Sequence, residues 1–221
     1  MDNQFSLDVV QAAEIKHAAA RNGVTNADIK TLCGGDMFAK ILPVLRGHAE
    51  IVFKSILSFL REVTIPASTE RFIAREKFVV DTSNTAKVKI AWTGDNFLEH
   101  FLGKIEEAQC EVILAIHKLE KTSSDGLIRI ELGRKREVTT LRSFFQLLFL
   151  QRNGQEGDLL TNGYANIFYI EDEDGNLRTV YTHWRTGFGG WNINADSVTN
   201  PDEWDAGFQV VSLLPTRKAR K

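Results

Sequence analysis

The sequence has few cysteines and prolines and no long apolar run. Of its 221 residues, two are Cys and four are Pro. Cys33 and Cys110 lie in separate segments without the spacing of a zinc site, so no disulfide framework is expected and a reducing compartment is favoured. The longest apolar stretch, from Ile51 to Leu60, contains Lys54 and is too short to span a bilayer. Because the N-terminus also has no signal-peptide pattern, we expect a cytoplasmic protein that does not enter membranes.

Familiar catalytic and cofactor motifs are also absent. The chain contains no GxxxxGK[ST] or GxGxxG phosphate loop, and no HExxH, GxSxG or CxxC. Asp172, Asp174 and Asn176 have the spacing that opens a calcium loop. However, the glycine and glutamate that such a loop needs at its sixth and twelfth positions are Leu177 and His183. We therefore predict no cofactor and no metal site.

Charge is nearly balanced, with a net value of −2, so no overall field favours nucleic acid or a membrane surface. Its distribution is uneven. Residues 153–216 contain two basic and 10 acidic side chains, whereas the segment 215–221 is basic and is expected to be disordered. A second basic cluster, Arg134, Lys135 and Arg136, follows Gly133 in a predicted turn. These two clusters support a nucleic-acid-binding hypothesis, which the overall charge does not favour.

The first third of the chain has helical patterns. Helices are predicted from Ser6 to about Arg21, after the capping-box residue Thr25, after Asp36, and from about His48 to Val63. Residues 1–66 are therefore predicted to form a helical module. Its segment 25–46 is similar to a helix-turn-helix, although its expected exposed surface has few cations for a DNA-reading helix.

Residues 70–214 are predicted to form a second domain, organised around a meander of strands between Leu159 and Val198. Asp174, Gly175 and Asn176 supply hairpin chemistry between two of these strands. Helices are expected after Asp95 and after Thr139 or Thr140, each lying on the sheet. Strands are expected at 72–80, 86–92, 111–119, 127–132, 166–171, 177–184, 191–195 and 208–214. The order predicts an α+β fold, with a small helical module followed by a largely antiparallel sheet and two packed helices.

Two strings in this second domain carry a resemblance. The string LLTNGYANIFY runs from Leu159 to Tyr169, and a Trp-x-x-Gly-x-Gln-Val pattern runs from Trp204 to Val210. With these strings, residues 70–213 resemble a family of bacterial hypothetical proteins. The resemblance implies a genuine domain of bacterial cytoplasmic type and implies no activity or ligand.

Aromatic and basic side chains of the meander are the candidate binding residues, because rings near Arg and His can stack on a base, a sugar or a partner's side chain. His183 and Trp184 are expected on opposite sheet faces, so they cannot serve one site. The full candidate set is Tyr164, His183, Trp184, Arg185, Trp191, Trp204, Arg134, Lys135 and Arg136.

Three functional hypotheses follow from these residues. The first is a non-enzymatic binding or regulatory module whose partner is another protein. The second is nucleic-acid binding. The third is an enzyme with a site assembled at long range near His183 or Cys110. The sequence predicts no particular oligomeric state.

Overall fold

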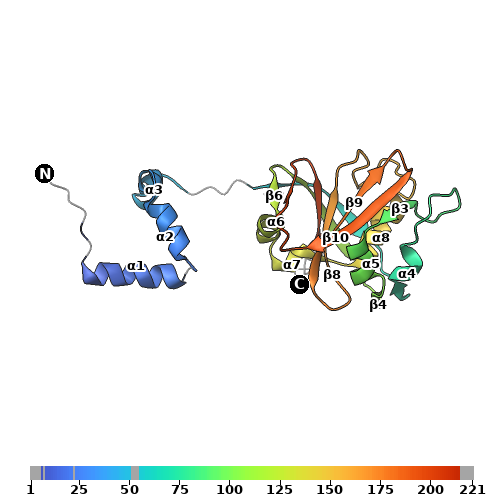
Figure 1. Cartoon of the computed structure of the whole chain (residues 1–221), viewed down its shortest axis with the longest axis horizontal. Coiled ribbons are helices and arrows are strands. Elements are labelled where there is room, and N and C mark those ends of the chain that lie inside the picture. Colours follow the sequence, from blue (N-terminus) through green and yellow to red (C-terminus); the bar gives the residue numbers. More distant parts are fainter. Residues whose placement is uncertain (1–5, 7, 22, 51–54, 215–221) are drawn as a thin grey trace, which may run out of the picture. The chain divides into compact units, whose positions relative to one another are not determined.

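The computed structural model describes residues 6, 8–21, 23–50 and 55–214. The chain forms two compact units, Met1–Lys54 and Ser55–Lys221 (Figure 1). The predicted basic tail lies outside the described residues.

The first unit contains three helices within its described residues, α1 (Val9–Arg21), α2 (Asn26–Cys33) and α3 (Met37–Leu45). The predicted capping box at the start of α2 is present. The Thr25 hydroxyl accepts a hydrogen bond from the Asp28 N–H at 3.3 Å, and the Asp28 carboxylate accepts one from the Thr25 N–H at 2.8 Å. None of the helical residues of this unit is buried. The three helices therefore do not enclose a core of their own.

The predicted helix from His48 to Val63 is wrong wherever the structure describes it, and its residues 51–54 lie outside the described residues. Leu57–Ile65 is a strand, β1, which pairs antiparallel with β5 (Val112–Leu119). The spaced apolar residues that favour a helix here are placed by pairing with a distant strand, and such tertiary context overrides local propensity. As a result, β1 belongs to the second unit, although it precedes the boundary predicted near residue 66.

The second unit is built on one large sheet with the order β1-β5-β12-β8-β9-β10-β3, and β7 also pairs with β8. Most neighbouring strands are antiparallel, whereas β12–β8, β7–β8 and β10–β3 are parallel. The α+β prediction is confirmed. The remaining strands of this sheet are β3 (Ile90–Thr93), β7 (Val138–Thr139), β8 (Asn166–Glu171), β9 (Leu177–Arg185), β10 (Gly190–Ser197) and β12 (Gln209–Leu214).

Short helices and two small strand pairs complete this unit. The predicted strand at Leu127–Leu132 is wrong, because the segment is the helix α6. Ile128 and Leu132 are buried four residues apart, while Leu127 and Ile130 are exposed, which is a helical pattern. The elements are α4 (Ala74–Lys77), α5 (Asp95–Phe101), α6 (Asp125–Leu132), α7 (Arg134–Glu137), α8 (Leu141–Leu150), and the pairs β2 (Phe72–Ile73) with β4 (Ile105–Glu106) and β6 (Ser123–Ser124) with β11 (Glu203–Trp204).

The predicted strand pair at 72–80 and 86–92 is wrong over most of its length. Only β2, β3 and an isolated bridge between Asp81 and Ile90 are extended there, and α4 occupies the middle of the first segment. The helix predicted after Thr139 or Thr140 is present as α8. Thr140 is the capping residue, since its hydroxyl accepts a hydrogen bond from the Ser143 N–H.

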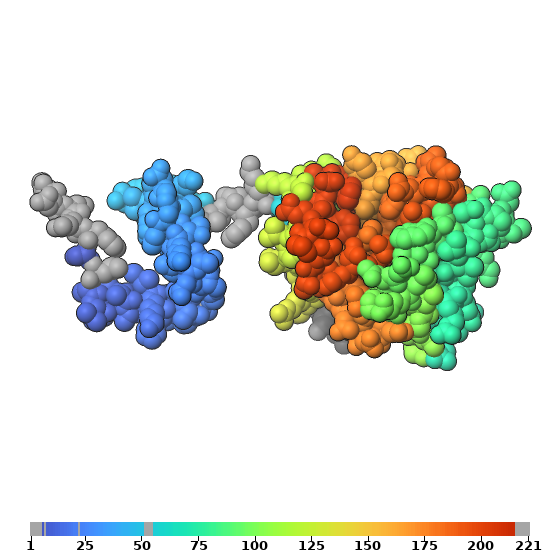
Figure 2. Space-filling view, viewed as in Figure 1, coloured from blue at the N-terminus to red at the C-terminus, as the bar shows by residue number. Residues whose placement is uncertain are grey.

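The sheet separates two apolar cores. Phe168 and Ile170 of β8 point into the larger core, and Ile167 and Tyr169 point into the smaller one. Helices α4, α5 and α8 lie toward one side of the unit and α6 and α7 toward the other (Figure 1). In the space-filling view, the green residues around α5 adjoin the orange and red residues of the C-terminal third, in agreement with the packing of α5 on β10 (Figure 2). With apolar groups on both faces, β8 is a central strand, as its sequence predicts.

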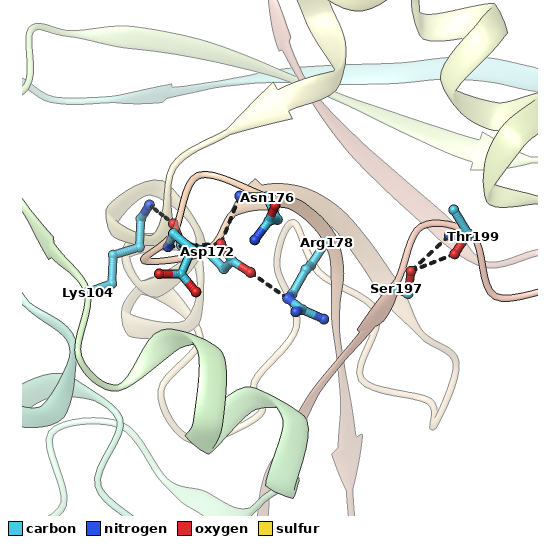
Figure 3. A network of polar contacts seen from close by, with 7 residues as sticks. Lys104, Asp172, Asn176, Arg178, Ser197 and Thr199 are labelled. Carbon is cyan, nitrogen blue, oxygen red and sulfur yellow. Dashed lines mark hydrogen bonds and ion pairs between the residues drawn. The ribbon is translucent and has the colours of Figure 1, made fainter.

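The predicted hairpin turn between β8 and β9 is organised by Asp172, which is 1% exposed. Its carboxylate accepts hydrogen bonds from Arg178 Nε at 2.7 Å and from the N–H groups of Asp174 and Asn176 at 3.0 and 2.8 Å, while Lys104 Nζ donates to its carbonyl (Figure 3). Burial acts to raise the pKa of this carboxyl, but Arg178 and the two N–H groups outweigh burial and hold the pKa below its usual range. These carboxylate oxygens are therefore occupied by protein donors.

Candidate functional site

A row of polar side chains lies on the part of the sheet formed by β9, β10 and β3. Tyr181, His183 and Arg185 alternate along β9 and so share one face. Asn194 and Asn192 of β10 lie directly opposite Tyr181 and His183, respectively. All of these side chains except the exposed Arg185 are half-buried. We call this surface the open face.

The open face is hollowed into a cavity of about 480 Å³. Trp92 of β3 lies beside Asn192 in the strand register and is 47% exposed. Phe188, in the turn between β9 and β10, is 71% exposed. Large exposed aromatic side chains beside amides are typical of ligand sites rather than of solvated surface. The lining residues are Ala91, Trp92, Tyr181, His183, Arg185, Phe188, Asn192, Ile193 and Asn194.

The amide of Asn194 is held in a fixed orientation. Its Nδ2 donates a hydrogen bond to the Tyr181 hydroxyl at 2.9 Å. Its Oδ1 lies so close to Gly94 that a Cβ at that glycine would be 2.0 Å away. Gly94 therefore allows the Asn194 side chain to lie flat against the chain between β3 and α5.

Asn192 is different, because its Oδ1 is buried and has no hydrogen-bond partner. Burying an unpaired amide oxygen is unfavourable, and native structures contain few such groups. This oxygen belongs to a cavity-lining residue between Trp92 and His183 in the strand register. Because this oxygen is closed to solvent, a donor in the cavity would reach it after the Asn192 side chain turns toward the cavity.

Among the described residues that line the cavity, only Arg185 is charged at pH 7. Burial, followed by the nearby Arg185 guanidinium, lowers the pKa of His183, so the imidazole is neutral at pH 7. Burial also raises the pKa of Tyr181, which keeps its hydroxyl protonated. The charge among the lining residues therefore comes from Arg185.

Trp184 and Trp191, two candidates from the sequence, lie in the larger core. They are 9% and 0% exposed, and their rings meet edge to face at 5.4 Å. A Cβ at Gly154 would lie only 2.2 Å from Trp184, so this loop glycine packs directly on the indole. These two tryptophans do not line the cavity.

Trp204 and Tyr164 also lie outside the cavity lining. Tyr164 packs edge to face against Phe208 at 5.4 Å. Trp204 is half-buried over the smaller core and contacts the Tyr181 ring at 4.9 Å. It also donates from Nε1 to Asp125, so its polar atom is satisfied within the protein.

Asp125 is the centre of a buried hydrogen-bond network. At 2% exposure, its carboxylate accepts hydrogen bonds from the Tyr169 hydroxyl at 2.7 Å, from Trp204 Nε1 at 2.9 Å and from the Thr179 hydroxyl at 2.9 Å. Burial raises the pKa of the Asp125 carboxyl, and these three donors offset only part of the effect. The network joins α6 to β8, β9 and β11.

The predicted basic turn forms the short helix α7. Arg134 and Lys135 are exposed. Arg136 is half-buried and donates to the carbonyl oxygens of Leu132 and Glu131 at the end of α6. One of the three cations therefore serves as a helix cap, which weakens the basic cluster as a phosphate-binding surface.

Of the nine sequence candidates, the structure brings only His183 and Arg185 into the cavity. Sequence reasoning missed Trp92, Phe188, Asn192 and Asn194. A signal for the two asparagines was present, since their alternation with apolar residues along β10 marks a polar face. Trp92 gave no comparable signal, because its pairing with β10 joins segments about 100 residues apart.

The residues that the structure describes contain no group of His, Cys, Asp and Glu arranged to hold a metal ion. None of the described helices combines the length and apolarity needed to cross a bilayer. No family model, curated protein or solved structure matches the chain.

Proposed function

We propose that this protein is a non-enzymatic ligand-binding module, and that the open face binds a small molecule with a flat ring and hydrogen-bond donors. The observation that carries this proposal is the buried, unpaired Asn192 Oδ1 beside the exposed Trp92 in a cavity of about 480 Å³. The ring would stack on the indole, and its donor would satisfy the amide.

The composition of the cavity supports binding rather than catalysis. Its nine described lining residues include no carboxylate, thiol, Ser hydroxyl or Thr hydroxyl. A Ser, Thr or Cys nucleophile paired with a base is therefore not assembled among them. Cys110, the other residue of the enzyme hypothesis, is exposed and does not line this cavity.

The test is a ligand screen by NMR on the full chain. Mixtures of nucleosides, nucleotides, monosaccharides and aromatic amino acids are added, and the indole N–H of Trp92 and the side-chain amide of Asn192 are observed. We expect at least one compound to shift both signals, and Trp92→Ala to weaken its binding at least tenfold. Phe59→Ala is the matched control, because Phe59 is also exposed but lies on β1, at the opposite end of the sheet order from β3. A screen in which no compound shifts these signals would reject the proposal.

Asn192→Leu separates function from stability. Removing the buried, unpaired Oδ1 is expected to raise the free energy of unfolding by about 1 kcal/mol, while ligand binding is lost. If the variant instead binds ligand like the wild type, the amide has no role in recognition.

We also propose, as a second function, that the helical unit contacts another protein. The supporting observation is the apolar side chains of α3, because Phe38, Leu42 and Leu45 are 55%, 38% and 71% exposed. Their spacing places them along one side of the helix, as in helices that bind a groove.

Cys33 and Cys110 are both free and exposed, which supports action in a reducing compartment such as the cytoplasm.

Cross-linking of the full chain tests this second proposal. The wild type and a Phe38→Ser, Leu45→Ser double variant are compared in extract from the native host. We expect a protein cross-linked to the wild type to be absent with the double variant, and equal cross-linking of both would contradict the proposal.

A further inference from the structure

The open face presents its groups in a fixed spatial order. Trp92, Asn192 and His183 form a row across β3, β10 and β9. Neighbouring strands are about 4.8 Å apart, so the row spans about 10 Å. Arg185 lies two residues beyond His183, which places its Cα about 7 Å further along β9. The flat aromatic surface and the cation are therefore at opposite ends of one cavity.

The charges of the lining residues select for an anion. Arg185 supplies the positive charge, and no carboxylate is among the described lining residues to repel a negative ligand. A guanidinium binds phosphate oxygens in pairs, with a geometry that a lysine ammonium cannot reproduce. Phe188 follows in the same turn, and its N–H donates to the Arg185 carbonyl at 3.0 Å, which fixes the backbone at this end of the cavity.

Resting on the proposed function, we propose that the ligand is a free nucleoside monophosphate. The base stacks on Trp92, the Asn192 side chain turns its Oδ1 toward the cavity and accepts a hydrogen bond from an N–H of the base, and the phosphate binds the Arg185 guanidinium. The ribose then lies over the middle of the face, near His183. Each group of this ligand matches a feature of the cavity that the protein leaves exposed or unpaired.

A single nucleotide fits these features better than a nucleic-acid strand. Strand binding requires a positively charged groove that follows the backbone over several phosphates. The cavity instead contains one guanidinium, and the chain has a net charge of −2. Its volume of about 480 Å³ also suits one nucleotide rather than several.

Isothermal titration of the full chain tests the inference. The probes are AMP, CMP, GMP and UMP, the four matching nucleosides, ribose 5-phosphate, and a ten-residue single-stranded oligonucleotide. We expect at least one monophosphate to bind ten times more tightly than its nucleoside and than ribose 5-phosphate. Arg185→Gln should remove the advantage of the monophosphate over the nucleoside, Trp92→Ala should weaken both at least tenfold, and Phe59→Ala should change neither.

Several outcomes would overturn the inference. Equal binding of monophosphate and nucleoside would remove the role of Arg185. An oligonucleotide that binds more tightly than every monophosphate, with a steep salt dependence, would assign the face to a strand. If no nucleotide binds while a sugar or another ring compound does so in a Trp92-dependent way, this inference fails and the proposed function stands. If no compound in either experiment binds, both fail.

Discussion

Trp204 donates a hydrogen bond from its indole Nε1 to the buried carboxylate of Asp125 at 2.9 Å, although 79 positions separate the two residues. This bond closes the network that also includes Tyr169 and Thr179, so the small pair β6–β11 is tied to the centre of the large sheet.

Substituting Asp125 will show how much this network stabilises the fold. Asp125→Ala leaves two buried hydroxyls and an indole N–H without an acceptor, and we expect it to lower the free energy of unfolding by about 3 kcal/mol. Asp125→Asn keeps an oxygen for Tyr169 and Trp204 and should cost about 1 kcal/mol. Urea denaturation at pH 7 measures both, and equal stability of the two variants would contradict the role of the carboxylate as the shared acceptor.

The same carboxyl has a pH dependence of definite sign. Its pKa is raised in the folded state, so the unfolded chain, with a pKa of about 3.9, ionises first as pH rises. The contribution of Asp125 to stability is therefore largest below about pH 4 and decreases as pH rises toward the raised pKa. The free energy of unfolding of the wild type, relative to that of Asp125→Asn, should therefore fall as pH rises from 4. A wild type that becomes more stable relative to the variant as pH rises would be inconsistent with a raised pKa.

Gly154 and Gly175 form a matched pair for testing the packing of Trp184. Both have positive φ, at 68° and 82°, but a Cβ at Gly154 would overlap the Trp184 ring, whereas a Cβ at Gly175 would meet nothing within 4 Å. Gly175→Ala should cost about 1 kcal/mol from backbone strain, and Gly154→Ala about 3 kcal/mol because overpacking adds to the strain. Thermal unfolding with near-ultraviolet circular dichroism measures both, and equal losses would mean that the Trp184 contact adds nothing.

The pKa of His183 can be measured directly, and it tests the electrostatics of the open face. Burial and Arg185 both lower its pKa, so its imidazole resonances should titrate below 6.5 in the wild type. Arg185→Gln should raise the midpoint without bringing it fully to 6.5, since burial remains. His117 is the internal control, because its lowered pKa depends on burial and Arg136 instead. A His183 midpoint that does not respond to Arg185→Gln would show that the two side chains do not interact.

The local sequence pattern predicts the strands of the meander correctly, but it does not predict β1 and α6. The strands β8, β9 and β10 could be predicted because alternation and the Asp174-Gly175-Asn176 turn point to the same hairpin. β1 and α6 could not be predicted because each is apolar on more than one side. The identity of β1 depends on pairing with β5, and that of α6 depends on burial of Ile128 and Leu132 in the smaller core.

The candidate site was predictable only in its polar half. His183 and Arg185 could be found because alternation along β9 separates them from Trp184, which the core requires. Trp191 is a wrong candidate, because the alternation along β10 places it with Ile193 and Ala195 on the apolar face, where it is buried. The position of Trp92 depends on the parallel pairing of β3 with β10, which no local pattern encodes.

The strand order also constrains how this domain is made by the ribosome. β12 lies between β5 and β8, yet it follows every other strand of the sheet in the chain. During synthesis, the β1–β5 pair and the β8–β9–β10 sheet therefore have edges that lack their β12 partner until residues 209–214 emerge, although β7 already pairs with the end of β8. Nascent chains that stall before that point would expose these edges to each other and to neighbouring chains, which makes the interval before β12 arrives the period of greatest aggregation risk.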